Sequence, residues 1–356
     1  MERDYTVYVG TYANENESGI FRYELNGAQR KLKLRLEQQG IANPSYLALS
    51  RDGEFLYAVM ENMEYHGEAG GGICAVKCSK NALELVNSRG TGGTLPCHVL
   101  LDEEHKVVYA ANYMSGSLSM FPLAADGSLE NMSDFKQHEG KGPNGLRQEG
   151  PHVHFSGLSP EKDGIWSVDL GTDRVIFYES DFQNMSLHHK PERDIVLPGG
   201  TGPRHFVFSP GNNYVMYVVC ELSSEVFAVD LSKGESRILQ RISTLKEADS
   251  QSTCGAIKCS EDGRFLYASN RGDDSIAVFE IEKETGLLCL VQLQKTGGRT
   301  PRDILVLEDI VLAANQDSNT ITCFSRDEKT GLIIPEQEKT DCRSPVCLTA
   351  IAVDIS

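Results

Sequence analysis

The sequence has no apolar run long enough to cross a bilayer, and Met1 to Tyr5 lack the apolar segment of a signal peptide. It also has no long run of lysine and arginine, and its formal net charge is -17. Nucleic acid and anionic membranes both need a basic patch. We therefore expect a cytoplasmic protein that binds neither, in which a few local Arg or His residues would have to reverse the field around any anionic substrate.

Several chemical motifs are also missing. The ten cysteines include no CxxC pair, and most lie in strand-like segments, where a reduced Cys behaves as a small buried hydrophobe. There is no GxSxG motif, no P-loop and no GxGxxG that follows a strand and opens a helix. No disulfide framework or cofactor is expected, and hydrolysis by activated water fits better than covalent catalysis.

Helical periodicity is almost absent. The apolar runs are short, rich in Val, Ile, Tyr and Phe, and separated by Gly, Asp, Asn and Ser. This pattern predicts an all-β chain. The acidic stretches 280–284 and 326–329 precede Thr-Gly pairs and are interpreted as solvated outer hairpin turns.

One unit is repeated along the chain. Its copies begin at Asn43-Pro44, Leu95-Pro96, Gly150-Pro151, Gly202-Pro203, Thr300-Pro301 and Ser344-Pro345, with Ser252-Thr253 as a degenerate copy. The spacing of about 44 to 55 residues lies in the range of propeller blades. After each start come a strand, a turn such as Asp52-Gly53, a second strand ending in polar residues, and two further strands. The unit is a four-stranded antiparallel meander.

The two ends of the chain complete each other. The chain starts with what is elsewhere a second strand, residues 5–11, and a third, residues 19–23, and it ends with a first strand, residues 346–351. Pairing them in one blade would close a ring and remove exposed sheet edges. We predict one domain spanning residues 1–356, a seven-bladed β-propeller.

The candidate site lies on one rim, because the start of a first strand and the end of an antiparallel second strand share a face. The catalytic candidates there are His152, His154, Arg204, Glu221 and Arg271, and the substrate-binding candidates are Asn112, Gln148, Asp169, His205, Asn270, Arg302 and Asn315. Arginines can bind phosphate or carboxylate in bidentate fashion and stabilise an oxyanion. His152 or His154, with Glu221, offers a base to activate water.

Simpler interpretations compete with this one. A single His or Arg at a strand end is usually a surface or turn residue, and only the recurrence at matching repeat positions favours a site. The HxH pair could also chelate a metal together with Asp169 or Glu221. Because no clear further ligand is present, we expect no metal.

The sequence resembles the propeller-type 6-phosphogluconolactonases, a lactonase family that includes fungal carboxy-muconate lactonising enzymes. The matching stretches are 8–12, Arg147-Gln148 through His154, 169–174, 202–205, Glu221-Leu222 and 269–279, with Asp273 where many relatives have His. The resemblance implies a seven-bladed propeller whose site contains His152 or His154, Arg204, Glu221 and Arg271.

The resemblance also gives the function expected: hydrolysis of 6-phospho-D-glucono-1,5-lactone to 6-phosphogluconate, in the pentose phosphate pathway. The expected partner is thus a small sugar-phosphate lactone, and the expected state is a monomer or weak homo-oligomer. Two alternatives stay open. One is another sugar or muconate-type lactone, and the other is a non-catalytic propeller that binds a ligand or protein, although the GH and WD pairs of scaffold propellers are missing.

Overall fold

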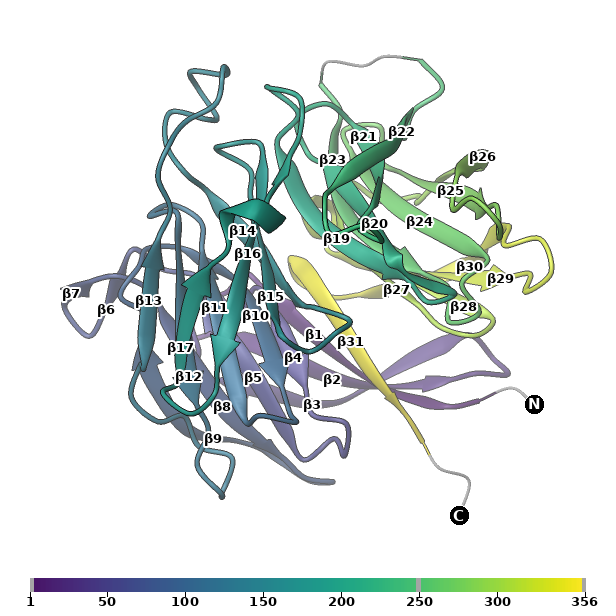
Figure 1. Ribbon diagram of the computed structural model, residues 1–356. Coiled ribbons are helices and arrows are strands. Elements are labelled where there is room, and N and C mark those ends of the chain that lie inside the picture. Colours follow the sequence, from purple (N-terminus) through teal and green to yellow (C-terminus); the bar gives the residue numbers. More distant parts are fainter. Residues whose placement is uncertain (1–2, 248–250, 354–356) are drawn as a thin grey trace.

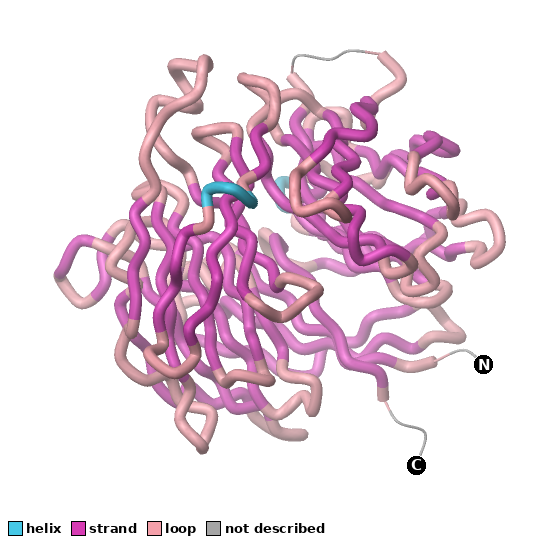
Figure 2. The backbone as a smooth tube through the Cα atoms, in the orientation of Figure 1, coloured by secondary structure: helices cyan, strands magenta, loops and turns pink. Residues whose placement is uncertain are grey.

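Seven β-sheets arranged in a ring make up nearly all of the regular structure (Figures 1 and 2). This computed structural model describes residues 3–247 and 251–353. Within these ranges the only helical segments are two single 3-10 turns, η1 (Pro191–Arg193) and η2 (Gln316–Ser318). None of the helices in the described part of the chain is long and apolar enough to cross a membrane.

Six of the sheets are built from consecutive strands. The first sheet contains β4 (Leu47–Leu49), β5 (Phe55–Met60), β8 (Gly72–Cys78) and β9 (Leu83–Gly90). The second sheet contains β10 (Pro96–Asp102), β11 (Val107–Asn112), β12 (Ser117–Pro122) and β13 (Asp134–Gln137). The third contains β14 (Val153–Leu158), β15 (Gly164–Asp169), β16 (Arg174–Asp181) and β17 (Ser186–His189), with β18 (Ile195–Val196) added to β16. The fourth contains β19 (Pro203–Ser209), β20 (Asn212–Cys220), β21 (Glu225–Asp230) and β22 (Arg237–Ser243). The fifth sheet contains β23 (Thr253–Cys259), β24 (Phe265–Arg271), β25 (Ser275–Ile281) and β26 (Leu288–Lys295). The sixth sheet contains β27 (Pro301–Val306), β28 (Ile310–Asn315), β29 (Thr320–Arg326) and β30 (Ile333–Asp341). A small hairpin of β6 (Glu64–Tyr65) and β7 (Glu68–Ala69) is inserted in the first sheet, between β5 and β8.

The seventh sheet joins the two ends of the chain. Its strand order is β3 (Lys31–Gln39), β2 (Ser18–Asn26), β1 (Tyr5–Thr11) and β31 (Pro345–Ala352). In Figure 1 the yellow β31 lies against the purple N-terminal strands, and the register pairs Tyr5 with Ala352 and Gly10 with Cys347. The predicted all-β, seven-bladed propeller with four-stranded antiparallel blades, closed by both termini, is therefore confirmed.

The first strand of each blade is the innermost one. Each first strand contacts the first strand of the next blade, from β4 through β10, β14, β19, β23 and β27 to β31, which contacts β4 again. These seven strands surround the central channel. Any side chain near the start of a first strand therefore lies close to its counterparts from other blades.

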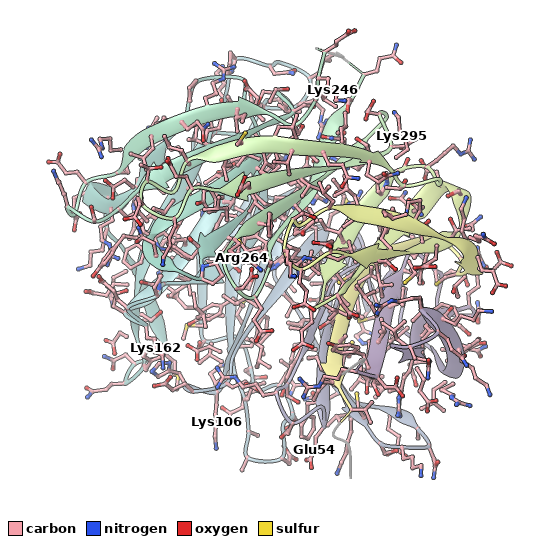
Figure 3. The ribbon with its side chains drawn as sticks, turned by 90° about the vertical axis from the view of Figure 1, so that its right-hand side faces the viewer. Glu54, Lys106, Lys162, Lys246, Arg264 and Lys295 are labelled. Carbon is pink, nitrogen blue, oxygen red and sulfur yellow. The ribbon has the colours of Figure 1, made fainter. Side chains whose placement is uncertain are left out.

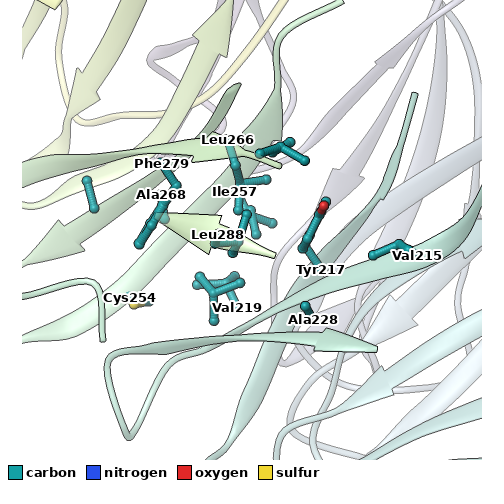
Figure 4. Close-up of a cluster of buried hydrophobic side chains, with 13 residues drawn as sticks. Val215, Tyr217, Val219, Ala228, Cys254, Ile257, Leu266, Ala268, Phe279 and Leu288 are labelled. Carbon is teal, nitrogen blue, oxygen red and sulfur yellow. The ribbon is translucent and has the colours of Figure 1, made fainter. Parts of the chain in front are cut away.

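Apolar side chains fill the space between every pair of neighbouring blades, in seven separate clusters. Figure 4 shows the cluster between the fourth and fifth sheets, where Val215 and Tyr217 face Leu266 and Phe279. The middle strands are buried on both faces, so β11, β15 and β28 are apolar or small along almost their whole length rather than alternating. Charged side chains such as Lys106, Lys162 and Arg264 lie on the outside (Figure 3).

The outer hairpin turns also link neighbouring blades. The hydroxyl of a tyrosine on one second strand donates to the carbonyl of a turn glycine in the next blade in three cases: Tyr57 to Gly127 (2.9 Å), Tyr217 to Gly286 (2.9 Å) and Tyr267 to Gly331 (2.8 Å). Gly331 has φ 70°, and a Cβ there would lie 2.3 Å from the ring of Phe265. The acidic residues of the stretches 280–284 and 326–329 are exposed, as expected, but Arg326 in the second stretch is buried. The Thr-Gly pairs that follow these stretches contribute contacts between blades.

Candidate active site

The strand register places four side chains at the same level of the channel. Pro96, Val153, Pro203 and Pro301 each pair with the last residue of their second strand. The next residues, Cys97, His154, Arg204 and Arg302, are therefore equivalent and all line one small recess in the channel.

This register corrects the alignment drawn from the sequence. That alignment made Gly150-Pro151-His152 equivalent to Gly202-Pro203-Arg204, whereas Val153 takes the place of Pro203 and His154 that of Arg204. The backbone shows the same offset, since the residue before the proline has positive φ at Asn43, Leu95, Gly202, Thr300 and Ser344 but not at Gly150. Pro151 ends a long loop instead of beginning the strand.

Three arginines converge on Glu221, which follows β20. Arg204 Nε lies 3.1 Å from Oε2, Arg271 Nη2 lies 2.7 Å from Oε2, and Arg147 Nη2 lies 2.5 Å from Oε1. Arg204 is further fixed by donating from Nη1 to the carbonyl of Gly255 (3.0 Å) and to Nε2 of His205 (3.1 Å). The cluster is a fixed array of cations around one carboxylate.

The two histidines of the HxH motif contact Tyr113 in different ways. The ring of His152 stacks on Tyr113 with centroids 4.6 Å apart, and both of its nitrogens have partners, Nδ1 at the Tyr113 carbonyl (3.0 Å) and Nε2 at Glu149 (3.3 Å). The ring of His154 meets Tyr113 edge to face at 5.5 Å, and its buried Nδ1 has no hydrogen-bond partner among the described residues. His154 is therefore the histidine with a nitrogen available for a water or a substrate.

The charges around the recess set the protonation of its groups. Burial would raise the pKa of Glu221, but Arg271, Arg204 and further cations outweigh burial and hold this pKa well below its usual value. Burial and the neighbouring Arg204 hold the pKa of His154 well below its ordinary value. Burial and the nearby Arg271 and Arg302 lower the pKa of Arg204 to about 10. At neutral pH the site thus combines an ionised carboxylate, a neutral imidazole and charged guanidinium groups.

Comparison with known proteins identifies the family. The family described as "Lactonase, 7-bladed beta-propeller" matches residues 6–350. A 6-phosphogluconolactonase from Bacillus subtilis is 35% identical over 351 residues, which cover 97% of both chains, and one from Formosa agariphila is 35% identical over 91% of this chain and 93% of its own length. The solved structure of the periplasmic gluconolactonase PpgL from Pseudomonas aeruginosa is 30% identical, covers 99% of this chain and all of PpgL, and has a TM-score of 0.91.

The chain belongs to the lactonase family of seven-bladed β-propellers. The predicted family is therefore confirmed, and membership supports the expected activity at the level of a lactone hydrolase.

Several residues predicted to bind substrate have structural partners in this lactonase. The amides of Asn112, Asn270 and Asn315 are fully buried. Asn112 donates to Ser119 (3.0 Å), and Asn315 donates to Thr322 (3.0 Å), both within their own blades. Asn270 bonds to the hydroxyl and carbonyl of Thr244 in the loop at the end of the preceding blade. These contacts support the blade ends, and contact of the three residues with substrate stays a prediction.

Asp169 and Gln148 likewise support the loop before β14. Asp169 accepts hydrogen bonds from the backbone N–H groups of His152 (2.8 Å) and Gly171 (2.9 Å), and its other oxygen lies 2.9 Å from Nδ1 of His138. Gln148 is buried and donates to the carbonyl of Leu170 (2.9 Å). Both residues thus position the segment that carries His152, and their contact with substrate stays a prediction.

His205 and Arg302 do reach the channel. His205 lies one residue further along β19 than Arg204, against Phe155 and His154 at ring distances of 4.7 Å and 5.3 Å. Arg302 lies 5.4 Å from the ring of Tyr12 and makes no ion pair with the described residues. Burial opposes its charge, but Tyr12 and nearby carboxylates keep its pKa raised.

Sequence reasoning missed Arg147, Tyr113, Tyr12 and Glu61. One position is shared by several blades. It is the residue directly after the second strand at Tyr12, Glu61, Tyr113 and Glu221, and the last residue of that strand at Arg271. This shared position was a signal that could have found them. Arg147 comes from an irregular loop and carries no repeat signal.

Two other features are less suited to an active site than the channel. No cluster of three or more His, Cys, Asp or Glu residues suited to a metal occurs in residues 3–247 and 251–353. A cleft of about 400 Å³ between the third and fourth blades is lined by Trp166, Phe208 and Tyr214, but its arginine, Arg193, is paired with Asp163 at 2.5 Å. The channel, where cations, carboxylates and a free imidazole nitrogen meet, is chemically better suited to hydrolysis.

Proposed function

We propose that this lactonase hydrolyses 6-phospho-D-glucono-1,5-lactone to 6-phosphogluconate, a step of the pentose phosphate pathway. The observation that carries the proposal is the gathering of Arg147, Arg204, Arg271 and Arg302 at the channel mouth of a chain with net charge -17. Such a local reversal of charge suits a phosphorylated substrate. The names of the relatives from Bacillus subtilis and Formosa agariphila support the same substrate, which also fits the cytoplasmic location expected from the sequence.

The roles follow from the contacts. In this proposal His154, through its unpartnered Nδ1, takes a proton from the attacking water, and Glu221 stabilises the imidazolium that forms. Arg204, fixed by three hydrogen bonds, stabilises the oxyanion that develops on the lactone carbonyl. Arg271 and the partly exposed Arg302 bind the phosphate.

A second candidate is an unphosphorylated sugar lactone. The likeness to PpgL, a periplasmic gluconolactonase, favours it. Under this alternative the arginines serve the carbonyl and the developing carboxylate, so removing the phosphate from the substrate would not change kcat/KM.

The test is hydrolysis of freshly generated 6-phosphogluconolactone, coupled to 6-phosphogluconate dehydrogenase and compared with a blank for spontaneous opening. Wild type should exceed the blank and should prefer the phosphorylated lactone over glucono-1,5-lactone. Arg204→Ala should lower kcat/KM by about a hundredfold, as for loss of an oxyanion donor.

The matched control is Arg237→Ala, since Arg237 lies exposed on the outer strand β22. Its rate should equal that of wild type. Equal rates on the two lactones would move the assignment to unphosphorylated sugar lactones, and a wild-type rate no faster than the blank would reject hydrolysis of both.

A further inference from the structure

A second glutamate, Glu61, faces the recess from the first blade. It directly follows β5 as Glu221 directly follows β20, and the two segments, Tyr57 to Glu61 and Tyr217 to Glu221, correspond residue by residue. Glu61 lines the same recess as His154 and Arg204. The repeat therefore delivers two carboxyl groups to the channel from two different blades.

The surroundings of the two carboxyl groups are opposite in kind. Glu221 has three guanidinium groups within ion-pair distance, whereas Glu61 has none among the described residues. Glu61 instead contacts hydroxyl groups, with Tyr12 Oη at 3.1 Å and 3.0 Å from its two oxygens and the hydroxyl of Ser45 at hydrogen-bond distance. A carboxyl group held by hydroxyls can carry a proton, because each hydroxyl can either donate to it or accept from it.

The charged and titratable groups that act on Glu61 or share its recess are Tyr12, Arg302, Arg204, Cys97, Tyr46, His154, His205 and Asp303. Burial raises the pKa of Glu61, although Arg302, the hydroxyls of Ser45 and Tyr12, and Arg204 oppose this shift. The pKa of Glu221 moves the other way. Two carboxyl groups whose environments separate their pKa values are the usual arrangement for an acid and a base in one site.

The recess itself is small. It has room for about one water molecule, and Glu61, His154 and Arg204 all line it. A water or a leaving oxygen in this space would therefore lie near the base candidate, the oxyanion donor and Glu61 together.

We propose that Glu61 is the general acid of the reaction, which protonates the ring oxygen of the lactone as the acyl–oxygen bond breaks. This inference rests on the proposed function. His154 takes one proton from water, and the water oxygen bonds to the carbonyl carbon, whose π electrons move to the oxygen held by Arg204. When this intermediate collapses, the bond from the carbon to the ring oxygen breaks and that oxygen takes the proton of Glu61. The proton on His154 then returns to the Glu61 carboxylate through solvent, so that the net reaction consumes one water.

The first test compares Glu61→Gln with wild type in the coupled lactone assay. Since general acid catalysis contributes about a hundredfold to ten-thousandfold, kcat should fall by at least about a hundredfold while KM changes little. Glu64→Gln, a change of an exposed carboxylate in the β6–β7 hairpin three residues away, should leave both constants unchanged. An unchanged kcat in Glu61→Gln, or a rise in KM alone, would overturn the acid role.

The second test does not need a substrate. Infrared difference spectra of the wild-type protein at neutral pH should show a protonated carboxyl band that disappears in Glu61→Gln and persists in Glu64→Gln. If that band is absent, Glu61 is ionised and cannot be the acid, whatever the substrate is. If the band is present but wild type does not accelerate lactone opening, the proposed function fails while the protonated carboxyl group stands.

Discussion

Glu61 and Glu221 occupy the same position in two blades, one residue beyond the second strand, yet Glu61 is held by two hydroxyl groups and Glu221 by three guanidinium groups. The blade backbone thus presents equivalent side chains to one channel, and the neighbours supplied by other blades decide their charge.

Glu221→Gln should leave Arg147, Arg204 and Arg271 facing one another without a counter-charge. Breaking a buried ion pair from one side typically costs about 3 to 5 kcal/mol, so the free energy of unfolding should fall by about that amount. Phosphate ions should restore part of this loss, and thermal unfolding with added phosphate should show a larger rise in Tm than in wild type. Glu280→Gln, on the exposed side of β25, is the control. A variant with the wild-type Tm and no added response to phosphate would contradict the shared-counterion role.

Acid should destabilise the protein through three buried histidines. Burial holds the pKa of His98, His154 and His205 well below the ordinary value, so these rings are neutral when folded. Below pH 6.5 the unfolded chain binds protons that the folded chain does not, and stability therefore falls as pH falls. Each of these histidines should lower the free energy of unfolding by about 1.4 kcal/mol when the pH falls from 7.5 to 5.5.

Urea unfolding at the two pH values measures this loss of stability. In His98→Gln the loss should be smaller by the contribution of one histidine. His98 suits the comparison because it packs between Tyr46 and Phe155, below the level of Arg204 and His154. Equal stability at both pH values would show that these histidines take up protons equally in the folded and unfolded chains, so that burial does not lower their pKa values.

Removing a tyrosine hydroxyl between blades should have a graded effect. In Tyr57→Phe and Tyr217→Phe a glycine carbonyl loses its donor, whereas in Tyr267→Phe the Nε of Arg326, at 2.7 Å, loses its acceptor as well. We expect a loss of about 1 kcal/mol for the first two variants and about 2 to 3 kcal/mol for Tyr267→Phe, because a buried charged donor is costly to leave unpaired. Chemical denaturation of the three variants gives the order, and three equal losses would rule out a contribution from Arg326.

The fold could be predicted because a propeller repeats its signals. Each blade has its turn glycines and short apolar strands, and the unmatched strands at residues 5–11 and 346–351 required a shared blade. The third copy was misaligned by two residues because Gly150-Pro151 resembles the other starts, while the bulge between Val153 and Phe155 is fixed by pairing with β15. Register depends on long-range hydrogen bonds that a local motif does not encode.

The site could be predicted only in part, because side chains alternate in direction along a strand. Successive residues at the end of a strand point to opposite sides. Asn112 and Asn270 therefore bond to Ser119 and Thr244, whereas Tyr113 and Arg271, one residue later, contact Arg147 and Glu221. Arg147 has no repeat signal, because its loop takes its course from contacts such as that of Gln148 with Leu170, and only its place in a stretch that matches the family indicated it.

The pairing of β31 with β1 gives the chain a fixed order of events during synthesis. The ribosome releases β1, β2 and β3 before the other six blades, but their inner neighbour, Pro345–Ala352, is made only after those blades. The inner edge of Tyr5–Thr11 thus has unpaired backbone groups while the other six blades are synthesised, and such an edge can pair with other chains. A nascent chain stalled before residue 345 has the residues of the channel mouth but no closed ring to hold them together.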